Sequence, residues 1–112
     1  MRAVVYHGPG DVRLEEVPEP VLLEDEDAIV QVTTTSICGS DLHILHGLLP
    51  KMEPGRIIGH EYTGKVLEVG PGVTRFKPGD RVVGAAAVWC GRCRACQRGL
   101  FGSCERGATF GH

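Results

Sequence analysis

The protein has 112 residues, and its 12 Lys and Arg against 14 Asp and Glu leave a net charge of −2, with 42% of the residues hydrophobic. This length predicts a single soluble domain, residues 1–112, because domains have roughly 100 to 200 residues. The acidic balance argues against a nucleic-acid partner, which needs a basic surface. The longest nearly apolar run, Val82 to Trp89, is shorter than the about 18 residues that span a bilayer, so no membrane segment is expected.

The N-terminal segment is strand-like and has no signal-peptide pattern, so we expect a cytoplasmic protein. Without a route to an oxidising compartment, clustered cysteines are expected to be metal ligands rather than disulfides.

Short strands separated by turns dominate the expected secondary structure. The 16 glycines and 7 prolines favour turns over long helices. Alternation of apolar and polar residues, with Ala28, Val30 and Val32 on one face, indicates a half-buried strand. In chain order, strands are expected at residues 1–6, 12–17, 28–35, 62–69 and 81–88.

One short helix interrupts this pattern. Ser40 or Asp41 can cap a helix that runs to about His46, and Gly47 suits its C-terminal end. Residues 91–112 have few apolar side chains and no periodicity, so this segment needs a metal to hold a fixed shape. The fold class predicted is mainly β, with one helix and a metal-stabilised lobe.

Four of the five cysteines lie in the lobe at residues 90–104. Spacers of two, two and seven residues separate Cys90, Cys93, Cys96 and Cys104, which is the ligand pattern of a closed, structural zinc site. Disulfides, an iron–sulfur cluster and unligated structural thiols are the alternatives. The bacterial ferredoxin run has three residues and then a proline around its last cysteine, unlike the seven residues and Glu105 found here.

Three arginines, Arg92, Arg94 and Arg98, are interspersed with these cysteines. They would partly balance the −2 charge of a zinc tetrathiolate, or they serve solubility alone. The sequence does not choose between these two roles.

A second set of metal-binding residue types lies earlier in the chain. Cys38 is followed by His60 and Glu61, the ligand types of an open, catalytic zinc site. By spacing alone this signal is weak, and a buried free cysteine with a hydrogen-bonded core histidine is the better interpretation.

Four ordered motifs change that balance. They are the segment from Ser36 to His43, the signature from Gly59 to Val73, the turn from Phe76 to Val82 and the four-cysteine lobe. Together they resemble the N-terminal part of the zinc-dependent alcohol dehydrogenases. These enzymes belong to the medium-chain dehydrogenase/reductase superfamily, and their catalytic domain is a GroES-like β-barrel.

The resemblance implies roles for particular residues. Cys38 and His60 would bind the catalytic zinc, with Glu61 a ligand or close behind it. Ser40 would bond to the bound alcohol, and His43 would pass its proton toward solvent. A dication lowers the pKa of such an alcohol and favours the alkoxide from which a hydride leaves to NAD(P). The substrates implied are small alcohols, aldehydes or ketones.

The chain also departs from the family pattern. Family members take a further catalytic ligand from beyond the cysteine lobe and carry a Rossmann domain for the nicotinamide cofactor, with its glycine-rich turn. Neither occurs in these 112 residues, so we expect an incomplete GroES-like domain that binds zinc without turnover. An incomplete barrel leaves open strand edges, which favour self-association.

Two other classes of function compete with this hypothesis. A zinc-stabilised binding or assembly module with no enzymatic role would show the same cysteine lobe, and self-association through the open edges would be its signature. Nucleic-acid binding through the arginine-bearing lobe is the weakest candidate, because no aromatic residues are interleaved with the arginines.

Overall fold

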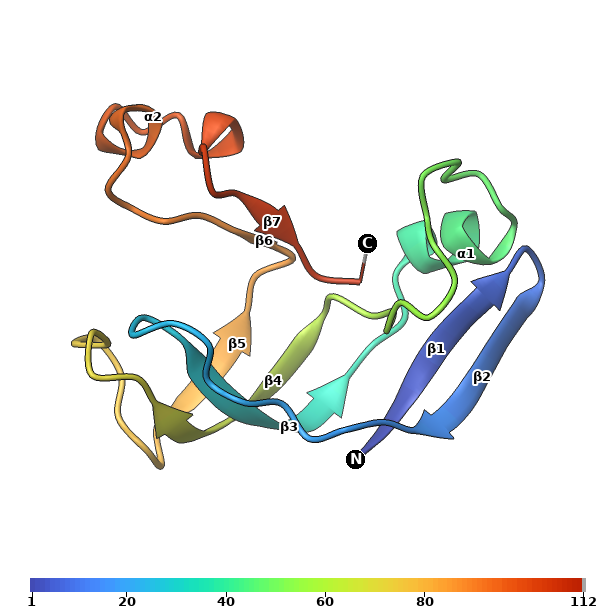
Figure 1. Ribbon diagram of the computed structural model, residues 1–112, viewed down its shortest axis with the longest axis horizontal. Helices are drawn as coiled ribbons and strands as arrows, with labels where there is room; N and C mark the ends of the chain where they lie inside the picture. The colour runs from blue at the N-terminus through green and yellow to red at the C-terminus, as the bar shows by residue number, and fades with distance from the viewer. Residues whose placement is uncertain (112) are drawn as a thin grey trace.

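The structure is a computed structural model that describes residues 1–111. His112, at which we placed the end of the domain, lies outside the described residues. The described part contains seven strands and three short helices, which confirms the mainly β prediction (Figure 1). In order, these are β1 (Arg2–Gly8), β2 (Asp11–Glu16), β3 (Ala28–Thr35), α1 (Gly39–Leu45), β4 (Tyr62–Val69), β5 (Arg81–Gly84), β6 (Ala87–Val88), α2 (Arg94–Gln97), the 3₁₀ helix η1 (Phe101–Ser103) and β7 (Ala108–Thr109).

Three separate antiparallel sheets organise the strands. β1 pairs with β2 in a hairpin, β4 lies between β3 and β5, and β6 pairs with β7 beneath the cysteine lobe (Figure 1). A bridge between Val5 and Ile57 joins the first hairpin to the segment before β4. The sheets therefore stay open within residues 1–111, and β3 and β5 are the edges of the central sheet.

The predicted bounds of β3 and β4 are confirmed, whereas the single strand predicted over residues 81–88 is wrong. The chain leaves the central sheet after Gly84, where the ring of Tyr62 fills the space a side chain would need, with its Cζ 2.1 Å from an added Cβ. The following residues pair with β7 instead. A pattern of apolar residues cannot reveal this change of partner.

Burial along β3 follows the expected alternation only in part. Ala28 is exposed, Val30 is half-buried and Val32 is 52% exposed. Register shifts between Ile29 and Val30 and between Val32 and Thr34 interrupt the pairing with β4 on either side of this stretch.

The helix α1 starts two residues earlier than the nearer predicted cap, Ser40, allows. Cys38 is its N-cap, and the carboxylate of Asp41, three residues later, accepts the Cys38 backbone N–H at 2.8 Å. Ser40 and Asp41 therefore lie inside the first turn. The predicted terminus is confirmed, because Gly47 follows the C-cap His46 with a φ of +71°.

The lobe contains two further helices that the sequence did not predict. α2 spans four residues and η1 three, which is too short for a 3.6-residue hydrophobic period to show. β7 was missed for the same reason, because it has only two residues.

The hydrophobic core is small. The buried apolar side chains are those of Val5, Tyr6, Ile44, Val66 and Cys96. Many large apolar side chains stay exposed, including Val83 at 78% and Ile37 at 84%. No helix within residues 1–111 has the length and hydrophobicity to cross a membrane.

Candidate metal centres

The fold brings together the three metal-ligand types predicted from the first half of the chain. One ligand atom from each of Cys38, His60 and Glu61 lies within 4.8 Å of the others. His60 is 6% exposed, while Cys38 is partly buried and Glu61 is exposed. A thiolate, an imidazole and a carboxylate are ligand types found together in catalytic zinc sites.

Pairing of β3 with β4 brings Glu61 close to the segment that leads to Cys38. Thr35 is opposite Tyr62 in the register, so the residues just beyond the two strand ends lie side by side. The Ser36 N–H donates to the Glu61 carbonyl at 3.2 Å, and the Ser36 hydroxyl bonds to the Glu61 carboxylate. The sheet therefore delivers Glu61 beside the segment that leads to Cys38.

The helix start determines the state of the Cys38 thiol. Hydrogen bonds from the Ser40 hydroxyl and backbone, followed by one from His60, hold the pKa of Cys38 below its usual range. The Ser40 hydroxyl is also 3.0 Å from His60 Nε2. The site thus favours the thiolate form that a zinc ion requires.

Asp41 contacts two of the candidate ligands, although from the sequence we considered it only as a helix cap. It is 9% exposed, and its Oδ1 lies 3.4 Å from His60 Nδ1 while its Oδ2 holds the Cys38 backbone. A carboxylate in this place orients the imidazole of a metal-binding histidine. The available signal was its position, three residues after the N-cap.

His43 stays a prediction. It is exposed in the last turn of α1, three residues after Ser40 and therefore on the same side of the helix. It is not part of the group of converging ligand atoms.

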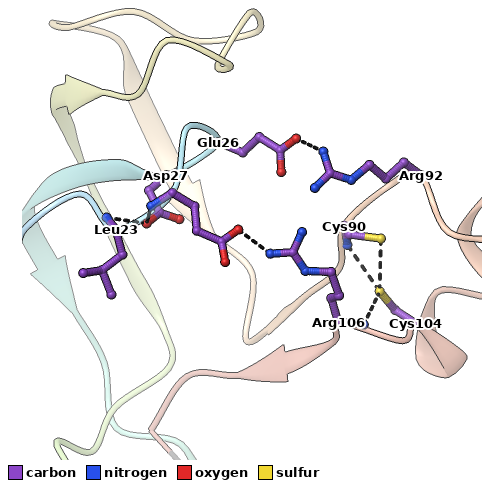
Figure 2. A network of polar contacts seen from close by, with 8 residues as sticks. Leu23, Glu26, Asp27, Cys90, Arg92, Cys104 and Arg106 are labelled. Carbon is purple, nitrogen blue, oxygen red and sulfur yellow. Dashed lines mark hydrogen bonds and ion pairs between the residues drawn. The ribbon is translucent and has the colours of Figure 1, made fainter.

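The four cysteines of the lobe converge on a second centre. One sulfur from each of Cys90, Cys93, Cys96 and Cys104 lies within 4.8 Å of the others, and all five cysteines of the chain are free of disulfides. The Cys90 N–H donates to the Cys104 sulfur at 3.3 Å (Figure 2). The Cys93 N–H donates to the Cys90 sulfur at 3.4 Å. Sulfurs that accept backbone N–H groups are prepared for the thiolate state.

The electrostatics of this centre differ from one sulfur to the next. Backbone N–H groups of Cys96 and Glu105 lower the pKa of Cys93 to about 6. Burial and the neighbouring sulfurs of Cys93 and Cys104 raise the pKa of Cys96 to about 12. A dication that shares its charge among four sulfurs removes this penalty, so the donor set fits a tetrathiolate zinc.

Known proteins share this fold and this pattern. The family model of the alcohol dehydrogenase GroES-like domain matches residues 24–112. A zinc-type alcohol dehydrogenase-like protein, AdhB, of Bacillus subtilis is 44% identical over the whole chain, and zinc-type alcohol dehydrogenase B of Aspergillus flavus is 46% identical over 99% of it. The solved structure of alcohol dehydrogenase TADH from Thermus sp. ATN1 superposes over 99% of the chain with a TM-score of 0.92 at 45% identity.

The open β fold with its cysteine lobe is thus a GroES-like domain of the zinc-dehydrogenase type. The chain belongs to the zinc-type alcohol dehydrogenases of the medium-chain superfamily. It spans between a quarter and a third of the length of these relatives, namely 32% of the Bacillus protein, 26% of the Aspergillus protein and 32% of the Thermus chain.

Proposed function

We propose that this chain supplies the substrate-side metal site of an NAD(P)-linked alcohol dehydrogenase that interconverts small alcohols with aldehydes or ketones. The observation that carries the proposal is the convergence of Cys38, His60 and Glu61 within 4.8 Å in a chain of this family. Cys38 and His60 are the assigned catalytic ligands, with Glu61 beside them. The four lobe cysteines hold the structural zinc.

Each neighbouring residue has a definite task in this assignment. A zinc ion, when bound, supplies a Lewis acid that lowers the pKa of an alcohol. Ser40, whose hydroxyl contacts His60 and Cys38, would take the proton of that alcohol while passing its own hydroxyl proton on. His43, one helical turn further on at an exposed position, would receive that proton and release it to solvent.

The described residues contain no glycine-rich turn of the kind that binds a dinucleotide. Neither α1 nor α2 follows a Gly-x-Gly-x-x-Gly turn, which cradles the pyrophosphate in dinucleotide-binding folds. The 112-residue chain by itself is therefore proposed to bind zinc but to produce no NAD(P)H. Steady NAD(P)H formation by the pure zinc-loaded chain with a panel of alcohols would refute this part of the proposal.

The zinc content of the purified chain tests the site assignment. The intact chain should hold two zinc ions, and Cys38→Ser should hold one, because serine is a poor zinc ligand and only the first site loses its thiolate. Cys96→Ser is the variant matched to Cys38→Ser, since it removes one thiolate from the four-cysteine site instead. One zinc in both the intact chain and Cys38→Ser contradicts the assignment of the first site.

The cytoplasm is the proposed location, with no nucleic-acid or membrane partner. A reducing compartment keeps the five free cysteines available as ligands. Salt-sensitive binding of the zinc-loaded chain to DNA or RNA would count against this part of the proposal.

A further inference from the structure

A short acidic loop in front of β3 has a well-defined shape. The Asp27 carboxylate accepts the backbone N–H groups of Leu23 at 3.0 Å and Glu24 at 2.9 Å, and the Asp27 N–H donates to the Glu24 carbonyl at 3.1 Å. These bonds close the loop on itself. They fix the direction in which the side chains of Glu24 and Glu26 leave it.

The loop is also fastened to the central sheet. The turn after β4 donates N–H groups from Gly70 to the Asp27 carbonyl and from Gly72 to the Asp25 carbonyl, each at 2.8 Å. The approach at Gly70 is so close that an added Cβ would be 2.3 Å from the Asp25 oxygen. The acidic loop is therefore a rigid extension of the sheet.

Two arginines of the cysteine lobe reach this loop. Arg92 forms an ion pair with Glu26, and Arg106 forms one with Glu24 (Figure 2). The partners are 66 and 82 residues apart in the sequence, so both pairs join the lobe to a distant part of the fold. The four side chains are about half exposed, at 46–56%.

Both arginines are directly connected to metal-ligand positions. Arg92 lies between Cys90 and Cys93, and the Arg106 backbone N–H donates to the Cys104 sulfur at 3.4 Å. The lobe itself stands on the two-residue strands β6 and β7. Opening the lobe far enough to release a metal therefore requires these arginines to move away from the loop.

We propose that Glu24, Glu26, Arg92 and Arg106 form a latch that holds the cysteine lobe against the central sheet and slows the loss of zinc from its four sulfurs. The inference rests on the structural zinc assigned under the proposed function. It gives Arg92 a positioning role that is distinct from both roles left open by the sequence, charge balance and solubility. Arg94 and Arg98 have no ion pair among residues 1–111.

The latch and a simple charge effect predict opposite results for the same change. The glutamates disfavour the negatively charged tetrathiolate, so neutralising them would strengthen zinc binding if charge alone mattered. If the latch exists, neutralising them frees the lobe and speeds zinc release. The sign of the change therefore distinguishes the two.

The experiment measures zinc release from the Cys38→Ser chain, in which only the four-cysteine site keeps all its thiolates. A chromogenic chelator in excess reports the rate at low ionic strength. Glu24→Gln with Glu26→Gln should release zinc about threefold to tenfold faster than the parent, since exposed pairs contribute modestly. In about 1 M salt, where charges are screened beyond about 3 Å, the difference should close.

Two matched variants separate the latch from general charge effects. Asp25→Asn removes a charge from the same loop, and Arg98→Gln removes one from the same lobe, but neither residue has an ion pair among residues 1–111. Arg106→Gln should release zinc faster than Arg98→Gln, and Asp25→Asn should match the parent or be slower. Circular dichroism of each variant shows whether it is folded.

The outcomes also separate this inference from the function on which it rests. A zinc-loaded parent whose double glutamate variant releases metal at the same or a slower rate overturns the latch alone. A parent with no zinc on its four cysteines overturns the structural-zinc assignment and the latch with it.

Discussion

Asp41 makes two contacts that bear on metal binding. One oxygen holds the backbone N–H of Cys38, and the other lies beside His60 Nδ1 at 3.4 Å. The buried carboxylate of Asp41 thereby fixes the start of α1, where Cys38 lies, and also orients the imidazole ring of His60. At the scale of single residues, the site depends on Asp41 as well as on its ligands.

Asp41→Asn should lower the affinity of the Cys38, His60 and Glu61 group for Co²⁺ by about 10- to 100-fold, because an amide orients the imidazole less well than a carboxylate. Titration of the metal-free chain, followed by the cobalt–thiolate absorption, measures this. Asp11→Asn, which alters an exposed ion pair with Arg13, serves as the control. Equal affinities for both variants would show that Asp41 does not position the ligand.

At the scale of elements, the pairing of β3 with β4 decides where the ligands meet. The two strands lie so close that Gly64 has no room for a side chain, since an added Cβ would be 2.3 Å from the Gln31 carbonyl oxygen. The same pairing ends at Thr35 and Tyr62, next to Ser36 and Glu61. Any widening between these strands would therefore displace Glu61.

Gly64→Ala should destabilise the chain by about 1–3 kcal/mol, because the methyl group forces the backbones of β3 and β4 apart. Denaturant unfolding measures the loss. Gly102→Ala is the control, since a Cβ at Gly102 meets nothing within 4 Å and its backbone is not left-handed. A Gly64→Ala chain as stable as Gly102→Ala would mean that the strands can separate at little cost.

At the scale of the whole molecule, the central sheet is open and carries exposed apolar side chains. Within residues 1–111, β5 pairs only with β4, and Val83 on this edge strand is 78% exposed. Unpaired backbone groups next to exposed β-branched side chains are a template for pairing with another chain. We therefore keep the prediction that the 112-residue chain self-associates.

Val83→Lys should shift the chain toward the monomer in sedimentation velocity, because a lysine on an edge strand opposes pairing between sheets. Val21→Lys adds the same charge at a residue that is 69% exposed but lies outside the strands. A clean monomer for the unaltered chain, or an equal shift in both variants, would contradict edge pairing.

Local patterns predicted much of this fold because they act over a few residues. The strands β3 and β4 were correct to the residue, and Gly47 was correct as the end of α1, since alternation and a left-handed glycine are local signals. The start of α1 was wrong by two or three residues, because Ser40, Asp41 and Cys38 compete for the cap and only the contact from Asp41 back to Cys38 decides among them.

By itself, the sequence determined the composition of the four-cysteine centre, because ligand type and spacing are written in the chain, whereas the group of Cys38, His60 and Glu61 was predicted only through the resemblance to a family. Cys90, Cys93, Cys96 and Cys104 lie within 15 consecutive positions, so almost any compact loop brings their sulfurs together. Only the tertiary structure decided the contacts between distant segments. The contact of Asp41 with His60 and the pairing of Arg92 with Glu26 depend on strand register and on how the lobe sits against the sheet. Such contacts join residues far apart in the chain, and no local pattern encodes them.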